Sequence, residues 1–190
     1  MNKNVLDFYM KAIGLKDVDR AGWKQVGIED VESVMSHIGG TILLAATIAS
    51  EKKLDLDMQK VYEMIAVKEL KKLKKEESVI NGKEYVDDVK SILPNEYLIN
   101  IYNEYTAGKT DESKFVLKVS KLESDIQAKK YELDGKLTLE NAKADVNYYP
   151  EDIKNKVGEI SKPSEGWIKF DREYYDDELF NSLSKDIEEI

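Results

Sequence analysis

The sequence predicts an all-α fold, a single-domain helical bundle of about six to eight helices. Apolar residues recur three and four positions apart over most of the chain, whereas the alternation typical of half-buried strands is scarce. The chain has only three prolines among its 190 residues and is 42% hydrophobic. Long helices are therefore permitted and a sizeable core can be filled. We expect residues 1–190 to form one helical domain.

Helix start and stop signals divide the chain into elements. The first helix should start near Val5 and end near Gly14, and residues 15–30 should form a loop. Asp30 and Asp57 are the expected N-caps of the second and third helices. The remaining helices are expected over residues 85–93, 97–105, 111–127, 139–146, 151–157 and 177–190. Residues 161–175 are expected to be a loop or a short hairpin.

Two helices carry informative stripes. In the third, Val61, Met64, Ile65 and Lys68 fall at i, i+3, i+4 and i+7, so the lysine shares the side of the core residues. The sixth should be capped by Thr110 or Asp111. Its expected inner stripe consists of Phe115, Val119, Leu122 and Ile126.

Composition excludes several classes of function. A net charge of −9 argues against binding a nucleic-acid polymer or an anionic membrane. The absence of cysteine excludes disulfides, thiolate metal sites and cysteine nucleophiles.

The longest apolar stretch, residues 42–49, is far shorter than the ~20 residues of a membrane span. The N-terminus lacks the pattern of a signal peptide, so we expect a cytoplasmic protein. His37 is the one histidine in the chain.

A series of short motifs follows in a fixed order. They are Arg20-Ala-Gly22-Trp23, Glu32-Ser33-Val34-Met-Ser-His37, Met64-Ile-Ala66-Val67-Lys68-Glu69, Glu104-Tyr105, Phe115-Val116 and Gln127-Ala128-Lys-Lys-Tyr131. The ordered set resembles the HD-domain metal-dependent phosphohydrolases, in particular their small 5′-deoxynucleotidase-like branch. The resemblance covers about residues 5–132, and residues 133–190 stay unassigned.

The resemblance implies a metal site, and this sequence departs from it. In the family, an early His, a His-Asp pair and a later Asp hold a divalent ion that activates water. Here His37 takes the place of the early His, Lys68 and Glu69 that of the pair, and Ser120 that of the later Asp. The family's acid/base Glu is replaced by Lys72.

These departures predict a degenerate HD-domain protein with no catalytic residues and no metal or other cofactor. The Lys68 ammonium can occupy the metal's position and pair with Glu69, but it cannot lower the pKa of a water as a divalent ion does. We expect a binding or regulatory module for a nucleotide or another phosphorylated small molecule, and a homodimer as in the family. The candidate binding residues are Arg20, Trp23, His37, Lys68, Glu69 and Ser120.

Two other functions stay open. One is an active metal-dependent phosphohydrolase whose divalent ion is held by His37, Glu69 and Glu77. The other is a structural or protein-interaction domain.

The candidate residues also have structural interpretations. His37 can simply be hydrogen-bonded in the core, and Lys68 can extend outward to solvent. Arg20 and Trp23 either hold a phosphate and stack on a base, or they pair with a carboxylate and fill the end of the bundle.

Overall fold

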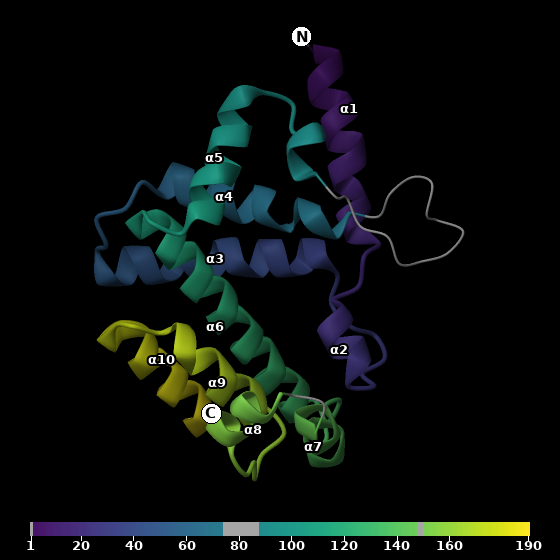
Figure 1. Ribbon diagram of the computed structural model, residues 1–190, viewed down its shortest axis with the longest axis vertical. Coiled ribbons are helices and arrows are strands. Elements are labelled where there is room, and N and C mark those ends of the chain that lie inside the picture. Colours follow the sequence, from purple (N-terminus) through teal and green to yellow (C-terminus); the bar gives the residue numbers. More distant parts are fainter. Residues whose placement is uncertain (1, 74–87, 148–149) are drawn as a thin grey trace. The chain divides into compact units, whose positions relative to one another are not determined.

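The computed structural model describes residues 2–73, 88–147 and 150–190, and every regular element in these ranges is a helix (Figure 1). The all-α prediction is therefore correct. The described ranges contain ten α-helices, more than the six to eight expected, because α2 and α9 lie where we expected loops. The described residues within 1–19 and 32–116 form one compact unit, and those within 20–31 and 117–190 form a second.

The first unit is built on α3 and α4, which pack side by side, with α5 against α4 (Figure 1). Its large fully buried side chains include Leu15, Val61, Met64, Ile65 and Leu70. Its elements are α1 (Asn2–Ala12), η1 (Ile13–Lys16), α3 (Val34–Lys52), α4 (Met58–Lys68), η2 (Glu69–Lys72), η4 (Val89–Ser91), α5 (Glu96–Ala107) and the first residues of α6 (Asp111–Leu133). Of the helix expected over 85–93, residues 85–87 lie outside the described residues, and η4 is the described part.

Helix α3 begins three residues later than expected. Its N-cap is Ser33 rather than Asp30, and the Ser33 hydroxyl accepts a hydrogen bond from the Ser36 amide at 3.1 Å. The helix ends at Lys52, and its C-cap, Lys53, adopts a left-handed backbone with φ 53°. Helix α3 is long and apolar enough to cross a bilayer, but the core helices of soluble proteins can be equally long and apolar. In α3, 39% of the most apolar 18-residue window is buried.

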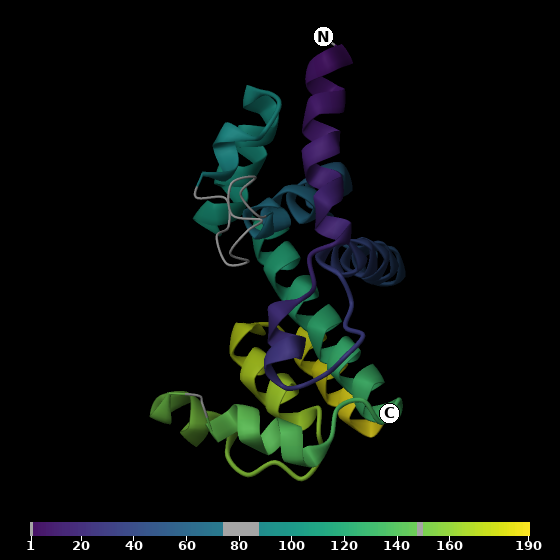
Figure 2. The same ribbon diagram turned by 90° about the vertical axis from the view of Figure 1, so that its right-hand side faces the viewer.

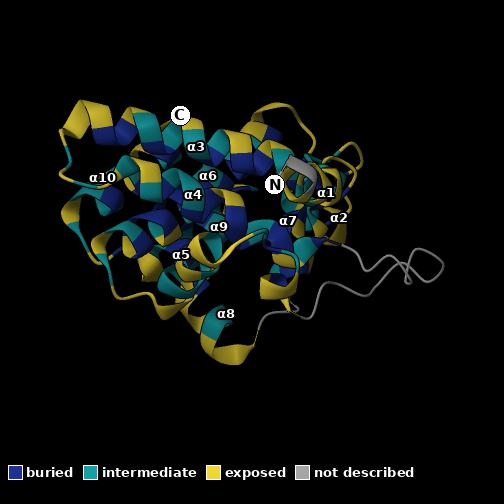
Figure 3. Ribbon diagram, turned by 90° about the horizontal axis from the view of Figure 1, so that it is seen from above, coloured by how far each residue is buried: buried dark blue, intermediate teal, exposed yellow. Residues whose placement is uncertain are grey.

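Helix α4 follows the prediction closely. The Asp57 carboxylate caps it by accepting a hydrogen bond from the Lys60 amide at 3.1 Å. Val61, Met64 and Ile65 are fully buried, and Lys68 on the same stripe is only 3% exposed. Figure 3 shows the buried residues along α4 and along one side of α3. The Lys68 side chain therefore points inward, as its position in the stripe predicts.

Helix α1 is helical as expected, but its apolar residues are not buried. Val5, Leu6, Tyr9 and Met10 are 53–70% exposed. Figure 2 shows α1 running from η1 out to the N-terminus. The amphipathic pattern therefore predicts the helix correctly, but the apolar side of the helix is not part of the core.

The second unit gathers short helices around the C-terminal part of α6 (Figures 1 and 2). They are α2 (Ala21–Gln25), α7 (Leu139–Asn147), α8 (Glu151–Val157), α9 (Glu165–Asp171), η5 (Arg172–Tyr174) and α10 (Glu178–Glu189). The expected ranges 151–157 and 177–190 agree with α8 and α10, and Asp177 is the N-cap of α10. The core cluster consists of Trp23, Val26, Ile28, Ala128, Tyr131, Leu137, Ala142, Val157 and Ile160.

In α6 the buried stripe differs from the expected one at its last position. Thr110, of the two candidate caps, accepts the amide hydrogen of Ser113 at 3.3 Å. Phe115, Val119 and Leu122 are buried as expected. Ile126, however, is 40% exposed, and the neighbouring Asp125 is completely buried. The interior of the second unit therefore contains a carboxyl group, that of Asp125 on α6.

Helix α9 replaces the expected loop or hairpin. The Glu165 carboxylate accepts hydrogen bonds from the amides of Ser161 and Lys162 at 2.6 and 3.1 Å and pairs with Lys169 one turn later. These bonds pair the amides of two residues that precede the helix, whereas its N-cap, Ser164, makes no side-chain capping hydrogen bond. The Ser-Glu pattern at positions 161 and 165 carries this signal only weakly, because the spacing is four rather than three.

Candidate functional site

Three of the predicted site residues meet in the interior of the first unit. The Lys68 ammonium forms an ion pair with the Glu69 carboxylate and lies 3.5 Å from Nε2 of His37. The same carboxylate oxygen lies 3.8 Å from that imidazole nitrogen. His37 and Lys68 are each 3% exposed, so the cluster is shielded from water.

Lys68 and Glu69 lie at the junction of two helices of different type. Neighbouring residues on a regular α-helix do not face each other. Helix α4 ends at Lys68, and the 3-10 helix η2 begins at Glu69. The two long side chains nevertheless reach each other at this junction and form an ion pair. His37 reaches the pair from the first turn of α3, which Ser33 caps.

The electrostatics of the cluster favour an ionised Glu69. Burial alone would raise the pKa of the Glu69 carboxyl, but the Lys68 ammonium and its hydrogen bond, assisted by His37, lower that pKa to about 2. Burial and the negative charge of Glu69 raise the pKa of Tyr105 to about 12. The carboxylate is therefore charged at neutral pH, and its compensating cation is Lys68.

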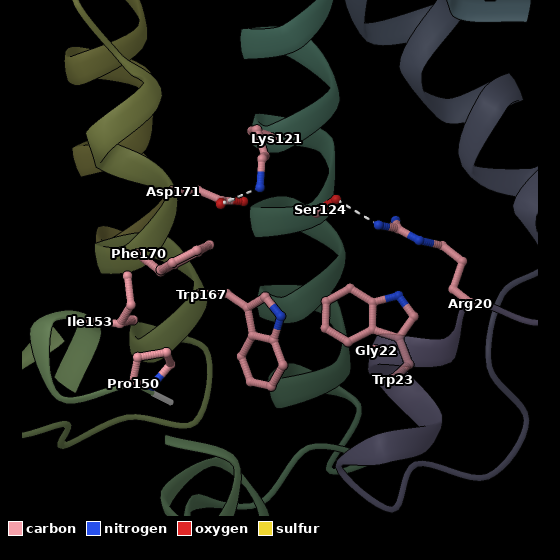
Figure 4. A pocket seen from close by; sticks show the side chains of 10 residues that line it. All are labelled: Arg20, Gly22, Trp23, Lys121, Ser124, Pro150, Ile153, Trp167, Phe170 and Asp171. Carbon is pink, nitrogen blue, oxygen red and sulfur yellow. Dashed lines mark hydrogen bonds and ion pairs between the residues drawn. The ribbon is translucent and has the colours of Figure 1, made fainter. Parts of the chain in front are cut away.

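The second unit contains a pocket of about 430 Å³. Figure 4 shows its indole and aliphatic groups on one side and its charged and hydroxyl groups on the other. The pocket is lined by Arg20, Gly22, Trp23, Lys121, Ser124, Pro150, Ile153, Trp167, Phe170 and Asp171.

Arg20 and Trp23 reach this pocket from α2 and the residue before it. The Arg20 guanidinium donates a hydrogen bond to the Ser124 hydroxyl at 2.9 Å and lies 3.5 Å from the Glu123 carboxylate. It also lies over the Trp23 ring, 5.6 Å from its centroid. Trp23 packs edge-on against Tyr131 in the core. The structural interpretation of this loop is therefore what the structure shows, because Arg20 pairs with a carboxylate and Trp23 fills the core. Trp23 also lines the pocket, and its stacking on a base, like the binding of a phosphate by Arg20, stays a prediction.

Helix α6 supplies the other cation. The Lys121 ammonium pairs with the Asp171 carboxylate at 2.9 Å and lies 4.4 Å from the centroid of the Tyr174 ring. Behind this pair, the Tyr175 hydroxyl donates a hydrogen bond to Oδ2 of Asp125 at 2.8 Å. Oδ1 of Asp125 has no hydrogen-bond partner among the described residues.

These two carboxyl groups do not ionise equally. Burial, and then the neighbouring Asp171, raise the pKa of Asp125 well above its usual value. Burial also raises the pKa of Asp171, against the opposing effect of Lys121. The pKa is therefore raised more strongly at the more deeply buried Asp125, while Asp171 pairs with Lys121.

The remaining predicted residues are less informative. Ser120 is buried on α6 in the second unit, and its carbonyl accepts a hydrogen bond from the Ser124 hydroxyl at 3.1 Å. Its place in a binding site remains a prediction. Glu77, the third ligand of the alternative metal site, lies outside the described residues.

Sequence reasoning did not select Lys121, Trp167, Phe170 or Asp171 for this pocket. Three of them lie in the segment after residue 132, which no motif covered. The available signal was composition, because Trp167 is the second of only two tryptophans in the chain.

A model described as HD domain matches residues 13–161, more than three quarters of the chain. The chain belongs to the HD domain family. A Dictyostelium discoideum protein named 5′-deoxynucleotidase HDDC2 is 27% identical over 162 aligned residues, which cover 73% of this chain and 85% of that protein.

Two solved structures from Pyrococcus resemble this HD-domain chain. A conserved hypothetical protein from Pyrococcus furiosus is 27% identical with a TM-score of 0.55, covering 68% of this chain and 83% of that one. The PH0347 protein from Pyrococcus horikoshii OT3 has a TM-score of 0.57 over 97% of this chain and 99% of its own, at 22% identity. The second likeness shows that the fold extends over nearly the whole chain.

The HD family implies a divalent metal, and the cluster around Lys68 does not fit one. Nε2 of His37 and Oε1 of Glu69 both face the Lys68 ammonium, which already supplies a positive charge. A metal between these two donors would lie against that ammonium with too few ligands for a first-row ion.

Proposed function

We propose that this HD-domain protein binds a nucleotide or another phosphorylated small molecule and does not hydrolyse it. The observation that carries this proposal is the buried Lys68 ammonium, paired with Glu69 and 3.5 Å from His37. In the family resemblance these three positions correspond to metal ligands. The ammonium of Lys68 thus takes the place of the exchangeable metal ion that the family binds.

The chemistry of an ammonium limits what such a site can do. It neutralises Glu69 and orders His37 much as a bound cation would, so the fold keeps its central charge balance. It cannot coordinate water and lower the pKa of that water toward neutrality, which is the main service of a catalytic metal. Lys72 takes the place of the family's acid/base Glu, so proton transfer loses its expected donor as well.

The ligand class is supported by the relatives and by local charge. The Dictyostelium relative is named a 5′-deoxynucleotidase, and it is similar to this chain over most of both lengths. Arg20 and Trp23, the residues expected to hold a phosphate and a base, line the same pocket. A guanidinium suits a phosphate because its donors form a planar fork.

Metal content, hydrolysis and ligand binding together test the proposal. The purified protein should contain no stoichiometric divalent metal and should release no phosphate from deoxynucleoside monophosphates when manganese, cobalt or magnesium is supplied. At least one nucleotide should raise its melting temperature, since a ligand that binds only the folded state stabilises it. Metal near one ion per chain together with hydrolysis would refute the proposal.

The second candidate is an active phosphohydrolase with an altered metal site. One observation favours it, since Glu32 offers a carboxylate oxygen within 4.8 Å of a ligand nitrogen of His37. If this candidate is correct, Glu32→Gln and His37→Asn should abolish metal-dependent phosphate release while Glu51→Gln, on an exposed part of α3, should not. Activity that survives in His37→Asn would exclude this site.

A further inference from the structure

Both tryptophans of the chain line one pocket of the second unit. Trp23 comes from α2 and Trp167 from α9, and their ring centroids lie 5.3 Å apart with planes inclined by 38°. Trp23 is almost fully buried, whereas Trp167 is only partly buried. The pocket therefore offers an indole surface backed by the core, and a flat apolar group can stack on it.

The opposite side of the pocket carries charge (Figure 4). The lining contains two cations, Arg20 and Lys121. Each has a carboxylate partner, since Lys121 pairs with Asp171 and Arg20 lies 3.5 Å from Glu123. An ammonium has three donor hydrogens, and the ion pair of Lys121 with Asp171 uses one of them. An anion that entered the pocket would meet donors there rather than the acidic surface typical of the chain.

Neighbouring aromatic rings hold Lys121 in place. Its ammonium lies 5.3 Å from the Phe170 centroid and 4.4 Å from the Tyr174 centroid. Such cation–π contacts restrict the side chain without consuming its donors. The charged end of Lys121 is thus fixed next to an aromatic wall, and one ligand could contact both.

We propose that this pocket binds a planar aromatic ring that carries an anionic group. The ring lies against Trp167, and the anion lies against Lys121 and Arg20. A volume of about 430 Å³ falls within the range of small-molecule pockets, roughly 300–1,000 Å³. A nucleoside monophosphate and an aromatic carboxylate share this chemistry, and the nucleotide form rests on the function proposed above.

Tryptophan fluorescence tests the pocket directly, because both emitters line it. We would titrate the full chain with deoxyadenosine monophosphate, benzoate, deoxyadenosine and inorganic phosphate, and measure affinities in parallel by calorimetry. Deoxyadenosine monophosphate and benzoate should quench emission saturably. Deoxyadenosine should bind about tenfold more weakly because it lacks the charge-assisted contact, and phosphate alone should not quench.

Three variants locate the ring and the anion. Trp167→Leu should weaken both aromatic anions about tenfold, in line with the usual strength of stacking on an aromatic side chain. Lys121→Met should weaken deoxyadenosine monophosphate about tenfold and leave deoxyadenosine unchanged, and Lys121→Arg should restore binding. The matched control is Lys130→Met on the same helix, because Lys130 is exposed and pairs with Asp134 one turn further along.

The outcomes separate this inference from the proposed function. If the nucleotide raises the melting temperature but neither the fluorescence nor Trp167→Leu responds, the pocket inference is wrong and the proposed function stands. Saturable quenching by benzoate alone supports the pocket and counts against a nucleotide ligand. If none of the probes changes the fluorescence, the pocket inference is wrong.

Discussion

Glu69 illustrates how one residue links charge to stability. Its carboxyl has a pKa of about 2 in the folded protein, against about 4.3 for a free Glu, because the Lys68 ammonium lies against it. A lowered folded pKa gives stability that is present above the unfolded pKa and is lost as pH falls through the folded pKa. The lowered pKa corresponds to about 3 kcal/mol of stability at neutral pH.

Glu69→Gln should therefore remove the acid sensitivity that this residue confers. We expect the variant to be less stable than the parent at neutral pH, because Lys68 loses its carboxylate partner, and the difference should shrink between about pH 4 and pH 2. Urea unfolding over this pH range measures it. Glu51→Gln is the control, since Glu51 is exposed. A stability difference that did not change with pH would show that the ion pair does not set the pKa of Glu69.

Asp125 should behave in the opposite way. Burial raises its pKa, so its contribution to stability is complete at low pH and is lost as pH rises through the folded pKa. Asp125→Asn cannot ionise and can still accept the hydrogen bond from Tyr175. The melting temperature of the variant should match the parent near pH 4 and exceed it progressively above neutral pH. Parallel curves would contradict this, and Asp134→Asn at an exposed position is the control.

At the scale of elements, the capping residues explain why the starts of several helices could be predicted from the sequence. Asp57 precedes a clear apolar stripe, and α4 begins where this cap predicts. Helix α3 shows the limit of this signal, because both Asp30 and Ser33 are good caps and only the structure shows which one is used.

Tertiary contacts explain the elements that the sequence did not reveal. Helices α2 and α9 are five and seven residues long, too short for a periodic pattern to establish them. Glu132 accepts hydrogen bonds from both the amide and the hydroxyl of Ser164 and so fixes the start of α9 from a distant part of the chain. The cluster of His37, Lys68 and Glu69 was predictable from aligned motifs. The pocket was not, because Trp167 and Asp171 lie beyond those motifs.

The cap of α3 matters to the site because His37 lies on the first turn of that helix. Ser33→Ala removes the acceptor for the Ser36 amide and should lower the free energy of unfolding by about 1 kcal/mol. Ser33→Asp keeps an acceptor and should retain stability near that of the parent. Chemical denaturation of the three proteins measures this, and equal stability of Ser33→Ala and the parent would show that the cap is dispensable.

At the scale of the whole molecule, the exposed side of α1 bears on assembly. Val5, Leu6, Tyr9 and Met10 are 53–70% exposed within a single short helix. Isolated apolar residues are normal on a surface, but such a concentration usually marks an interaction site. We propose that α1 takes part in the homodimer expected from the family, with the same helix of a second copy as its partner.

Light scattering coupled to size exclusion tests this assembly. The parent should elute with twice the chain mass of 21.8 kDa, and Leu6→Lys combined with Met10→Lys should elute at the single-chain mass with its helical circular dichroism retained. Charge at both positions would have to be desolvated in a dimer and is well solvated in a monomer, so the equilibrium should shift toward the monomer. Leu43→Lys is the control, because Leu43 is equally exposed but lies on α3. A parent that remained monomeric at all concentrations, or a double variant that still paired, would exclude α1 as the contact.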